Sequence, residues 1–339
     1  ERGIGTQADG GVPAVLEWLD GDDLGGEAAR GQLDQEEPDR PGAHHGDAVA
    51  ELHVAEVPRV ERDPERLEHR GVLGGHAVGQ RDDRVRRPAH HLAQAAVEAG
   101  INHIDTSDFY GPHVTNQLIR KALHPYPDDL CIVTKVSARR DEKGNWLPAM
   151  SPAELTQAVE DNLRHLGLEV LEVVNLRSML SPHGPVEGSL EAPLATLLEL
   201  KERGLIRHIG LSNVTAKQVA DAQKMTPIVC VQNLYNVAHR ADDALVDALA
   251  AQHIAWVPFF PLGGFTPLQA QELNEVAASL EATPMQVALA WLLQRAPNIL
   301  LIPGTSSRTH LAENIAAAEL VLPAEALRTL DNIATAARR

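Results

Sequence analysis

Short apolar runs alternate with amphipathic segments from residue 101 onward. The runs are rich in β-branched residues and apolar at consecutive positions, which is typical of strands buried on both faces. They predict seven strands, at residues 101–104, 131–134, 170–176, 206–211, 228–231, 254–259 and 299–302. The intervening segments have helical spacing and predict helices at residues 115–123, 152–166, 189–203, 216–224, 241–252 and 268–295.

Two helix boundaries carry clear local signals. Ser151, Pro152 and Glu154 supply a capping hydroxyl, a proline at the first helical position and a glutamate three residues after the cap. Together they predict a helix that begins at residue 152. Thr283 followed by Pro284 predicts a break within the last helical segment.

Buried strands separated by single helices predict a parallel sheet with right-handed crossovers. Seven such units in series nearly complete a (β/α)8 TIM barrel, which is the predicted α/β fold class. The alternative is an open, doubly wound sheet. No Gly-x-Gly-x-x-Gly follows any predicted strand, so a Rossmann-type dinucleotide site lacks support.

Residues 1–94 differ in composition from the rest. Before residue 101 the chain has no Lys, Ser, Asn, Phe, Tyr, Cys or Met, and it offers few large groups for a core. We expect residues 1–94 to be non-native, such as out-of-frame translation of GC-rich DNA; the alternative is a disordered or weakly folded extension. Residues 14–19 have the pattern of a helix start, and residues 49–57 alternate as a strand. If residues 1–94 supply the missing strand of the barrel, residues 49–57 are the best candidate for it.

Charge and cysteine content narrow the class of protein. The net charge of -17 at pH 7 argues against nucleic acid or an anionic membrane as a partner. Cys131 and Cys230 lie in apolar runs, as buried thiols do in a reducing compartment, so we expect no zinc site or other metal centre. No secretory leader is recognised, and no stretch reaches the roughly 18 apolar residues of a membrane span. We therefore expect a cytoplasmic protein.

Polar residues follow the predicted strands at the end where barrel enzymes place their active sites. Asp105 and Lys135 end neighbouring strands, and Tyr110 follows Asp105 by five residues. A phenol is a poor acid near neutrality, but a nearby ammonium stabilises its anion. Lys135 is placed to act on Tyr110 in this way, with Asp105 holding the lysine. The alternative is a purely structural ion pair.

These motifs resemble those of the aldo-keto reductase family. The similar segments are Asp105-Thr-x-x-x-Tyr110-Gly, Val-Thr-Lys135, Gly-Leu-Ser212-Asn213 and Gln232-x-x-Tyr-Asn236, in the family's order. The resemblance covers about residues 95–335. We take residues 95–339 as the barrel domain. It implies a barrel whose Gly-rich first strand is missing or replaced here. It also implies reduction of a small aldehyde or ketone with NADPH, with Tyr110 as the general acid, tuned by Lys135 and Asp105.

The same resemblance implies the cofactor contacts. Ser212, Asn213 and Gln232 would hydrogen-bond the nicotinamide carboxamide, and Phe259 would lie against its ring, although core packing is an alternative for Phe259. The full set of cofactor residues that it implies is Ser212, Asn213, Gln232, Phe259, Phe260, Leu262, Gly304, Thr305, Ser306, His310, Glu313 and Asn314.

The closing segment of this set is a Gly-containing turn followed by a helix start, an arrangement that favours an anion. It resembles the family's adenosine-phosphate site. Many relatives carry Lys where Gly304 stands and Arg where His310 stands. Arg308, the hydroxyls and the helix terminus are left to hold a 2′-phosphate, and NADPH is expected rather than NADH.

Arg177 stands where the family has a catalytic histidine. An arginine cannot switch protonation, but its fixed donors can orient and polarise a carbonyl. Two alternatives are open: Arg177 serves only as an ion-pair partner, or His183 in the following loop reaches the site.

Within the family, residues 100–113 and 257–267 look most like bacterial pyridoxal reductases, which reduce pyridoxal to pyridoxine. Phe109, Trp146, Phe260 and Phe265 are available to wall a flat aromatic aldehyde. A broad-specificity aldehyde reductase is the alternative within this class. Two further alternatives are an aldolase that uses Lys135 as a Schiff-base nucleophile and a non-catalytic NADPH-binding relic or sensor.

Overall fold

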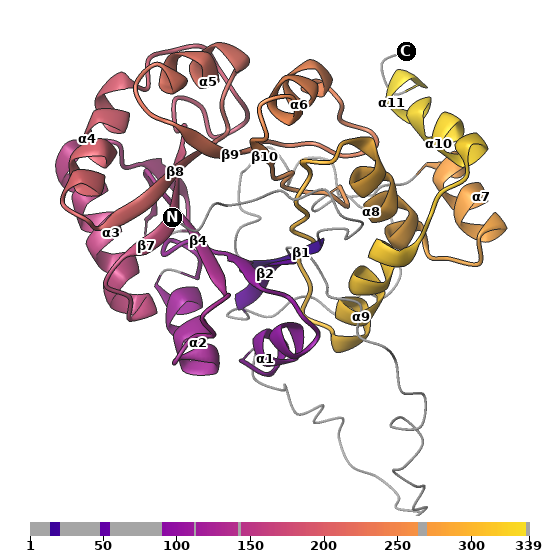
Figure 1. Cartoon of the computed structure of the whole chain (residues 1–339), viewed down its shortest axis with the longest axis horizontal. Helices are drawn as coiled ribbons and strands as arrows, with labels where there is room; N and C mark the ends of the chain where they lie inside the picture. Colours follow the sequence, from indigo (N-terminus) through magenta and orange to yellow (C-terminus); the bar gives the residue numbers. More distant parts are fainter. Residues whose placement is uncertain are drawn as a thin grey trace, which may run out of the picture.

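The computed structural model describes residues 14–20, 48–54, 90–111, 113–141, 144–263 and 270–336. Its main sheet has the strand order β1-β2-β3-β4-β7-β8-β9-β10 (Figure 1). From β3 to β10 each strand pairs in parallel with the next. These six strands are β3 (His103–Asp105), β4 (Cys131–Val136), β7 (Leu171–Arg177), β8 (Ile206–Ser212), β9 (Ile228–Gln232) and β10 (Ala255–Trp256).

Helices lie around the strands and separate them along the chain (Figure 1). Their bounds are α1 (His90–Glu98), α2 (Val114–Leu123), α3 (Pro152–Leu166), α4 (Glu191–Glu202), α5 (Ala216–Gln223), α6 (Asp243–Ala250), α7 (Gln271–Ser279), α8 (Pro284–Arg295), α9 (Arg308–Ala316), α10 (Ala324–Asp331) and α11 (Ile333–Ala336). A short hairpin, β5 (Ala138–Arg140) and β6 (Trp146–Pro148), follows β4. Both predicted helix boundaries are confirmed, because capping boxes at Ser151 and Thr283 begin α3 and α8.

The core lies on both faces of the sheet, as the continuous apolar runs predict. In β7 the consecutive residues Val173, Val174, Asn175 and Leu176 are all buried. The register from Leu171↔Ile206 to Arg177↔Ser212 brings the ends of β7 and β8 level. Polar side chains that end these strands therefore meet at one edge of the sheet.

The last predicted strand, at residues 299–302, is shorter than expected. The structure shows a single parallel bridge there, between Trp256 and Ile299, supported by a backbone bond of 2.8 Å from Trp256 N to Asn298 O. Pro297 and Pro303 flank this run, and a proline has no N–H for a sheet. β10 ends at Trp256, and after Pro258 the pairing continues as an isolated parallel bridge between Leu234 and Phe259.

Two strands from the N-terminal segment lie beside β3. They are β1 (Ala14–Asp20) and β2 (Ala48–Val54). The expected helix start at residues 14–19 is wrong, because pairing with β2 and with β3 at Glu17↔Asp105 decides the conformation of β1. Residues 49–54 of the alternating run at 49–57 lie in β2, which is antiparallel to β3, and residues 55–57 lie outside the described residues. β1 pairs with β3 in parallel only at Glu17↔Asp105, so in the described part of the chain the antiparallel β2 makes most of the pairing beside β3.

Helix α1 crosses the predicted domain boundary at residue 95. It begins at His90, and Ala93 and Ala96 are buried in the core of the barrel. Whether residues 1–94 are native sequence stays a prediction.

Within the described residues no single helix is long and apolar enough to cross a membrane. Helices α7 and α8 meet the length and composition limits only as a pair bent by 93°.

Candidate active site

A buried polar cluster occupies the ends of β3, β4 and β9. The Lys135 ammonium donates to Asp105 Oδ1, and the Gln232 amide donates to Asp105 Oδ2. All three residues are at most 3% exposed. Each strand end thus contributes one member, and both carboxylate oxygens of Asp105 have a partner.

Burial and the Lys135 charge shift the pKa of Asp105 in opposite directions. Loss of solvent raises the pKa of the Asp105 carboxyl, while the ammonium and the bonds from Lys135 and Gln232 oppose that rise. Burial, followed by the Lys135 charge, lowers the pKa of His103 to about 3, so His103 is neutral near pH 7.

Tyr110 lies against Lys135, as the sequence predicts. Its ring centroid is 5.1 Å from Lys135 Nζ, and the residue is 5% exposed. The loop after β3 holds the tyrosine through a bond of 3.1 Å from Tyr110 N to Ser107 O. Ser107 Oγ in turn donates to Lys135 O at 3.1 Å. The structure thus brings Asp105, Tyr110 and Lys135 together.

Arg177, the last residue of β7, lies between two aromatic rings. Its guanidinium carbon is 5.6 Å from the Trp146 ring centroid and 5.4 Å from that of Phe259. Arg177 Nη1 also donates to Ser212 Oγ at 3.4 Å. Phe109 meets the Trp146 ring edge-on at 4.9 Å. His183 is exposed on its loop.

Asn213 and Gln232, which are expected to bind a carboxamide, differ in whether their polar atoms already have hydrogen-bond partners. The Asn213 amide donates to Ser178 O at 2.8 Å and Ser181 O at 2.9 Å, and Asn213 has a left-handed φ of 57°. Asn213 therefore ties the loop after β7 to the end of β8 in this structure. Gln232 Oε1 is buried and has no hydrogen-bond partner in the described part of the chain. It is an acceptor that a carboxamide N–H would satisfy.

Asn175 is a buried polar residue that the sequence did not lead us to expect in the site. Its Oδ1 accepts from Cys230 Sγ at 3.2 Å, while Nδ2 has no partner among the described residues. Asn175 pairs with Lys135 in the sheet register. A Cβ at Gly210 would lie 2.0 Å from Asn175 Oδ1, so the glycine makes room for the amide. The available signal was a polar residue two positions before Arg177, on the same face of a strand.

The predicted phosphate segment forms a turn and the start of α9. Ser307 Oγ caps α9 by accepting from His310 N at 3.4 Å, and Thr305 Oγ1 accepts from Ser307 N at 3.0 Å. The exposed positions are Gly304, Ser306, Arg308, Thr309 and His310. The hydroxyls of Thr305 and Ser307 thus shape the turn, whereas Ser306 and Arg308 face solvent where an anion has access.

The remaining predicted cofactor residues occupy two neighbourhoods. Phe259 and Phe260 are half-buried and meet edge-on at 5.5 Å, and Leu262 packs against the core. Glu313 and Asn314 lie within α9, where Asn314 is buried. Phe265, expected to wall the substrate, lies outside the described residues.

Sequence comparison identifies relatives over most of the barrel. The sequence model of the Aldo/keto reductase family matches residues 72–335. Pyridoxine 4-dehydrogenase from Escherichia coli (strain K12) is 67% identical over 251 residues, which are 74% of this chain and 88% of that protein. An uncharacterized oxidoreductase from Schizosaccharomyces pombe is 37% identical over 69% of this chain and 75% of its own length.

Solved structures of aldo-keto reductases superpose on most of this chain. A thermostable aldo-keto reductase in complex with the inhibitor epalrestat superposes with a TM-score of 0.62 at 29% identity, over 74% of this chain and 89% of its own. An aldo-keto reductase from Klebsiella pneumoniae in complex with NADPH gives a TM-score of 0.59 at 23% identity, over 72% and 86%. These matches confirm the predicted barrel class.

Proposed function

The chain belongs to the aldo/keto reductase family and is an oxidoreductase, and from this premise we propose that Tyr110, Lys135 and Asp105 carry out the reduction of a small aldehyde. The observation that carries the proposal is the buried Asp105–Lys135 pair with the Tyr110 ring against the ammonium. The pair places a positive charge beside the one phenol at the ends of β3 and β4.

In the proposed reaction NADPH, when bound, supplies the hydride to the carbonyl carbon. Tyr110 donates its phenolic proton to the carbonyl oxygen, and the Lys135 ammonium stabilises the phenolate that remains. Asp105 keeps the ammonium in place and, with Gln232, prevents it from turning away. Arg177 directs fixed donors toward the carbonyl oxygen from the end of β7.

Two features support NADPH as the cofactor. Gln232 Oε1 is a buried acceptor without a partner in the described residues, next to the catalytic cluster. The start of α9 exposes Ser306 and Arg308 beside a helix N-terminus, where a phosphate is stabilised. The protein would thus offer a hydrogen-bond acceptor to one end of the cofactor and a cation to the other end.

We propose an aromatic aldehyde, with pyridoxal as the first candidate. The E. coli relative at 67% identity is a pyridoxine 4-dehydrogenase, an activity on the alcohol side of the same pair. Trp146 and Phe259 place aromatic rings against Arg177, and Phe109 meets Trp146, which suits a flat ring that carries oxygen atoms. Cytoplasmic location belongs to the proposal, supported by two free cysteines among the described residues. Nucleic acid and membranes are not expected as partners of so acidic a chain.

The buried ion pair favours a reductase over an aldolase. A Schiff-base lysine needs a neutral amine to attack a carbonyl, but Lys135 is 3% exposed and bonded to a carboxylate that favours its charged form. Borohydride with pyridoxal should therefore leave Lys135 unmodified. A covalent adduct at Lys135, seen by mass spectrometry, would support the aldolase.

The direct test is NADPH oxidation by the full chain with pyridoxal, compared with benzaldehyde and an aliphatic aldehyde. Turnover with pyridoxal at the highest kcat/KM is the expected result. Equal rates with all three aldehydes would replace the substrate proposal with a broad-specificity reductase. NADPH binding without turnover, both here and in a version with a parallel first strand restored, would indicate a cofactor-binding relic.

A further inference from the structure

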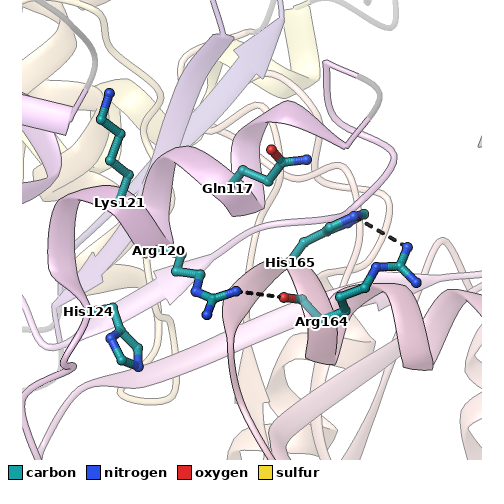
Figure 2. Close-up of a pocket in the computed structure, with 6 residues that line it drawn as sticks. All are labelled: Gln117, Arg120, Lys121, His124, Arg164 and His165. Atoms are coloured by element: carbon teal, nitrogen blue, oxygen red, sulfur yellow. Dashed lines mark hydrogen bonds between the residues drawn. The ribbon is translucent and has the colours of Figure 1, made fainter.

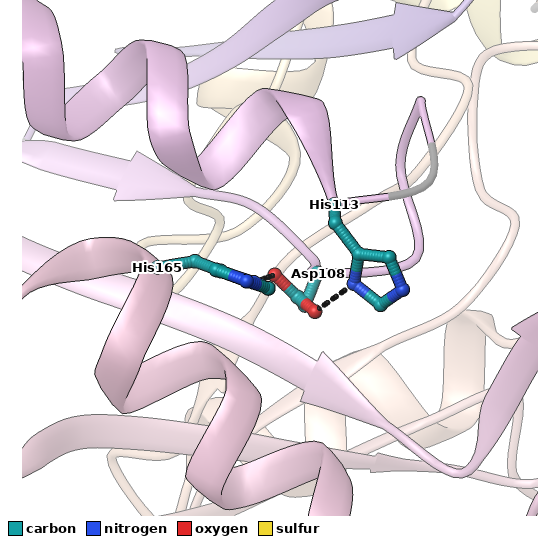
Figure 3. A group of neighbouring side chains, drawn as sticks. All are labelled: Asp108, His113 and His165. Carbon is teal, nitrogen blue, oxygen red and sulfur yellow. Dashed lines mark hydrogen bonds and ion pairs between the residues drawn. The ribbon is translucent and has the colours of Figure 1, made fainter.

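Three side chains of metal-binding type meet on the outer side of the loop that follows β3 (Figure 3). Asp108 belongs to this loop, His113 directly precedes α2, and His165 lies in the last turn of α3. One ligand atom from each residue lies within 4.8 Å of the other two. The candidate active site uses none of these side chains.

The carboxylate holds the two imidazoles on either side. His113 Nδ1 is 2.5 Å from Asp108 Oδ2, and His165 Nδ1 is 2.7 Å from Asp108 Oδ1. Asp108 is 5% exposed, whereas the His113 side chain is 54% exposed and gives access from solvent. Asn116 Nδ2 donates to Asp108 Oδ1 at 3.2 Å and so orients the carboxylate from behind. The cluster is therefore held by its surroundings and open on one side.

We propose that Asp108, His113 and His165 bind a divalent transition metal ion, with Zn²⁺ the best match to the donor set. Two imidazole nitrogens and one carboxylate oxygen are typical zinc ligands, and they leave a fourth position for water. Mg²⁺ and Ca²⁺ prefer sites made of oxygen atoms alone and suit this cluster poorly.

Binding requires a small rearrangement that the geometry permits. Each imidazole binds a metal through Nδ1 when its ring proton is on Nε2. Arg164 Nη2 lies 3.4 Å from His165 Nε2 and competes with that proton. The same Nη2 is only 2.5 Å from Asp161 Oδ1, so Arg164 retains a partner when it gives up His165.

A basic depression adjoins the cluster and opposes a cation (Figure 2). It is lined by Gln117, Arg120, Lys121, His124, Arg164 and His165. Figure 2 shows Arg164 next to His165, which the depression shares with the cluster. Removal of the Arg164 charge should therefore tighten metal binding, an effect opposite in sign to the loss of a ligand.

The site also joins the Tyr110 loop to α3. Asp108 lies two residues before Tyr110, and His113 N donates to Asp108 O at 2.8 Å. A metal held by Asp108 and His165 would add a link between that loop and the helix, so Zn²⁺ should raise the thermal unfolding midpoint. This inference rests on the cluster and is independent of the substrate.

The test measures Zn²⁺ binding by calorimetry and Co²⁺ binding by its visible absorption in the full chain. His44, His45, His90 and His91 form two adjacent histidine pairs in the sequence. They are first changed to Gln, to remove competing sites. In this parent we expect one ion per chain and an intense Co²⁺ band typical of four-coordinate N/O ligation. Absence of binding at about 1 mM metal would overturn the proposal.

Three variants of the parent locate the site. His113→Gln and His165→Gln should each weaken Zn²⁺ binding by at least about 100-fold, because loss of a residue that only orients a metal ligand already costs about 10–100-fold. His113→Gln changes an exposed side chain and should not disturb the fold. Arg164→Gln should tighten binding, and the control His124→Gln should leave it unchanged. Unaltered affinity in both ligand variants would place the metal elsewhere and refute the site.

Discussion

The two ends of the candidate active site are built in opposite ways. At the ends of β3, β4 and β9, Asp105, Lys135 and Gln232 are buried and bonded to one another. At the start of α9, Ser306 and Arg308 are exposed, and the hydrogen bonds there only shape the turn. The protein fixes the first end by its own packing, whereas the second end offers charge and backbone N–H groups to a ligand.

This difference predicts how each end responds to substitution. Interactions in the buried end act in low dielectric and have no solvent to replace them, so their loss should be large. Charges at the exposed end are screened by water and salt, so changes there should be modest and dependent on ionic strength.

The largest effect is expected for Tyr110→Phe. The change removes only the phenolic proton, and loss of a positioned general acid commonly lowers a rate by about 10² to 10⁴. Cofactor affinity should stay within a few-fold of the wild type. NADPH oxidation and NADPH fluorescence titration measure the two quantities. Turnover near the wild-type rate would remove Tyr110 from its proposed role.

Lys135→Met should abolish activity and change the pH dependence of stability. Burial already raises the pKa of Asp105, and the variant lacks the ammonium that opposes this rise. The native state then binds a proton that the unfolded chain has released. Stability should therefore fall as pH increases from about 4 toward the raised pKa of the folded state. The cost of the broken buried pair at neutral pH is expected to be about 3–5 kcal/mol.

Urea unfolding at about pH 5 and about pH 8 tests this expectation. The variant should be more stable at the lower pH, and the difference should exceed that of the wild type. The double variant with Asp105→Asn is the control, because it has no carboxyl to titrate. An equal pH dependence in all three proteins would show that the Asp105 charge does not govern stability.

Sequence reasoning succeeded where the signal was local. Asp105 and Lys135 each end a short apolar run, so their meeting at one edge follows from the parallel order of the strands. Continuous apolar runs also predicted most strands, and Ser151 and Thr283 marked their helices. The run at residues 299–302 pairs less than predicted, with one parallel bridge at Ile299, because apolar composition does not register the prolines that flank it.

Contacts between side chains far apart in the sequence could not be predicted from local patterns. The Gln232–Asp105 bond joins residues 127 positions apart, and the motif alone suggested a cofactor contact for Gln232. Asn213 was expected to bind a carboxamide, yet its amide holds the loop of Ser178 and Ser181. His165 approaches Asp108 across 57 positions, so no spacing rule could predict their cluster. Tertiary packing decides such contacts, and a single sequence does not encode them in a local pattern.

At the exposed end, Arg308→Gln should weaken NADPH by about tenfold and leave NADH nearly unchanged. A charge-assisted bond to a phosphate is worth roughly 1.5–3 kcal/mol, and exposure of Arg308 places the effect at the low end of that range. Arg328→Gln changes another exposed arginine, on α10, and is the matched control. Michaelis constants for both cofactors at two salt concentrations provide the measurement. A parallel loss for NADPH and NADH would exclude selective contact with the 2′-phosphate.

The smallest effect is a gain, expected for Gly304→Lys. Gly304 is exposed in the turn before α9, and its φ is not in the left-handed region, so a lysine fits without backbone strain. An added ammonium beside the helix N-terminus should tighten NADPH by a few-fold, because exposed ion pairs contribute only about 0.2–1 kcal/mol. The gain should disappear at high salt and should be absent for NADH. Gly304→Gln adds a side chain of similar length without charge and separates the electrostatic effect from new packing. If the lysine and glutamine variants bind NADPH equally well, the turn before α9 does not face the phosphate, and the contrast between a fixed and a ligand-completed end loses its support.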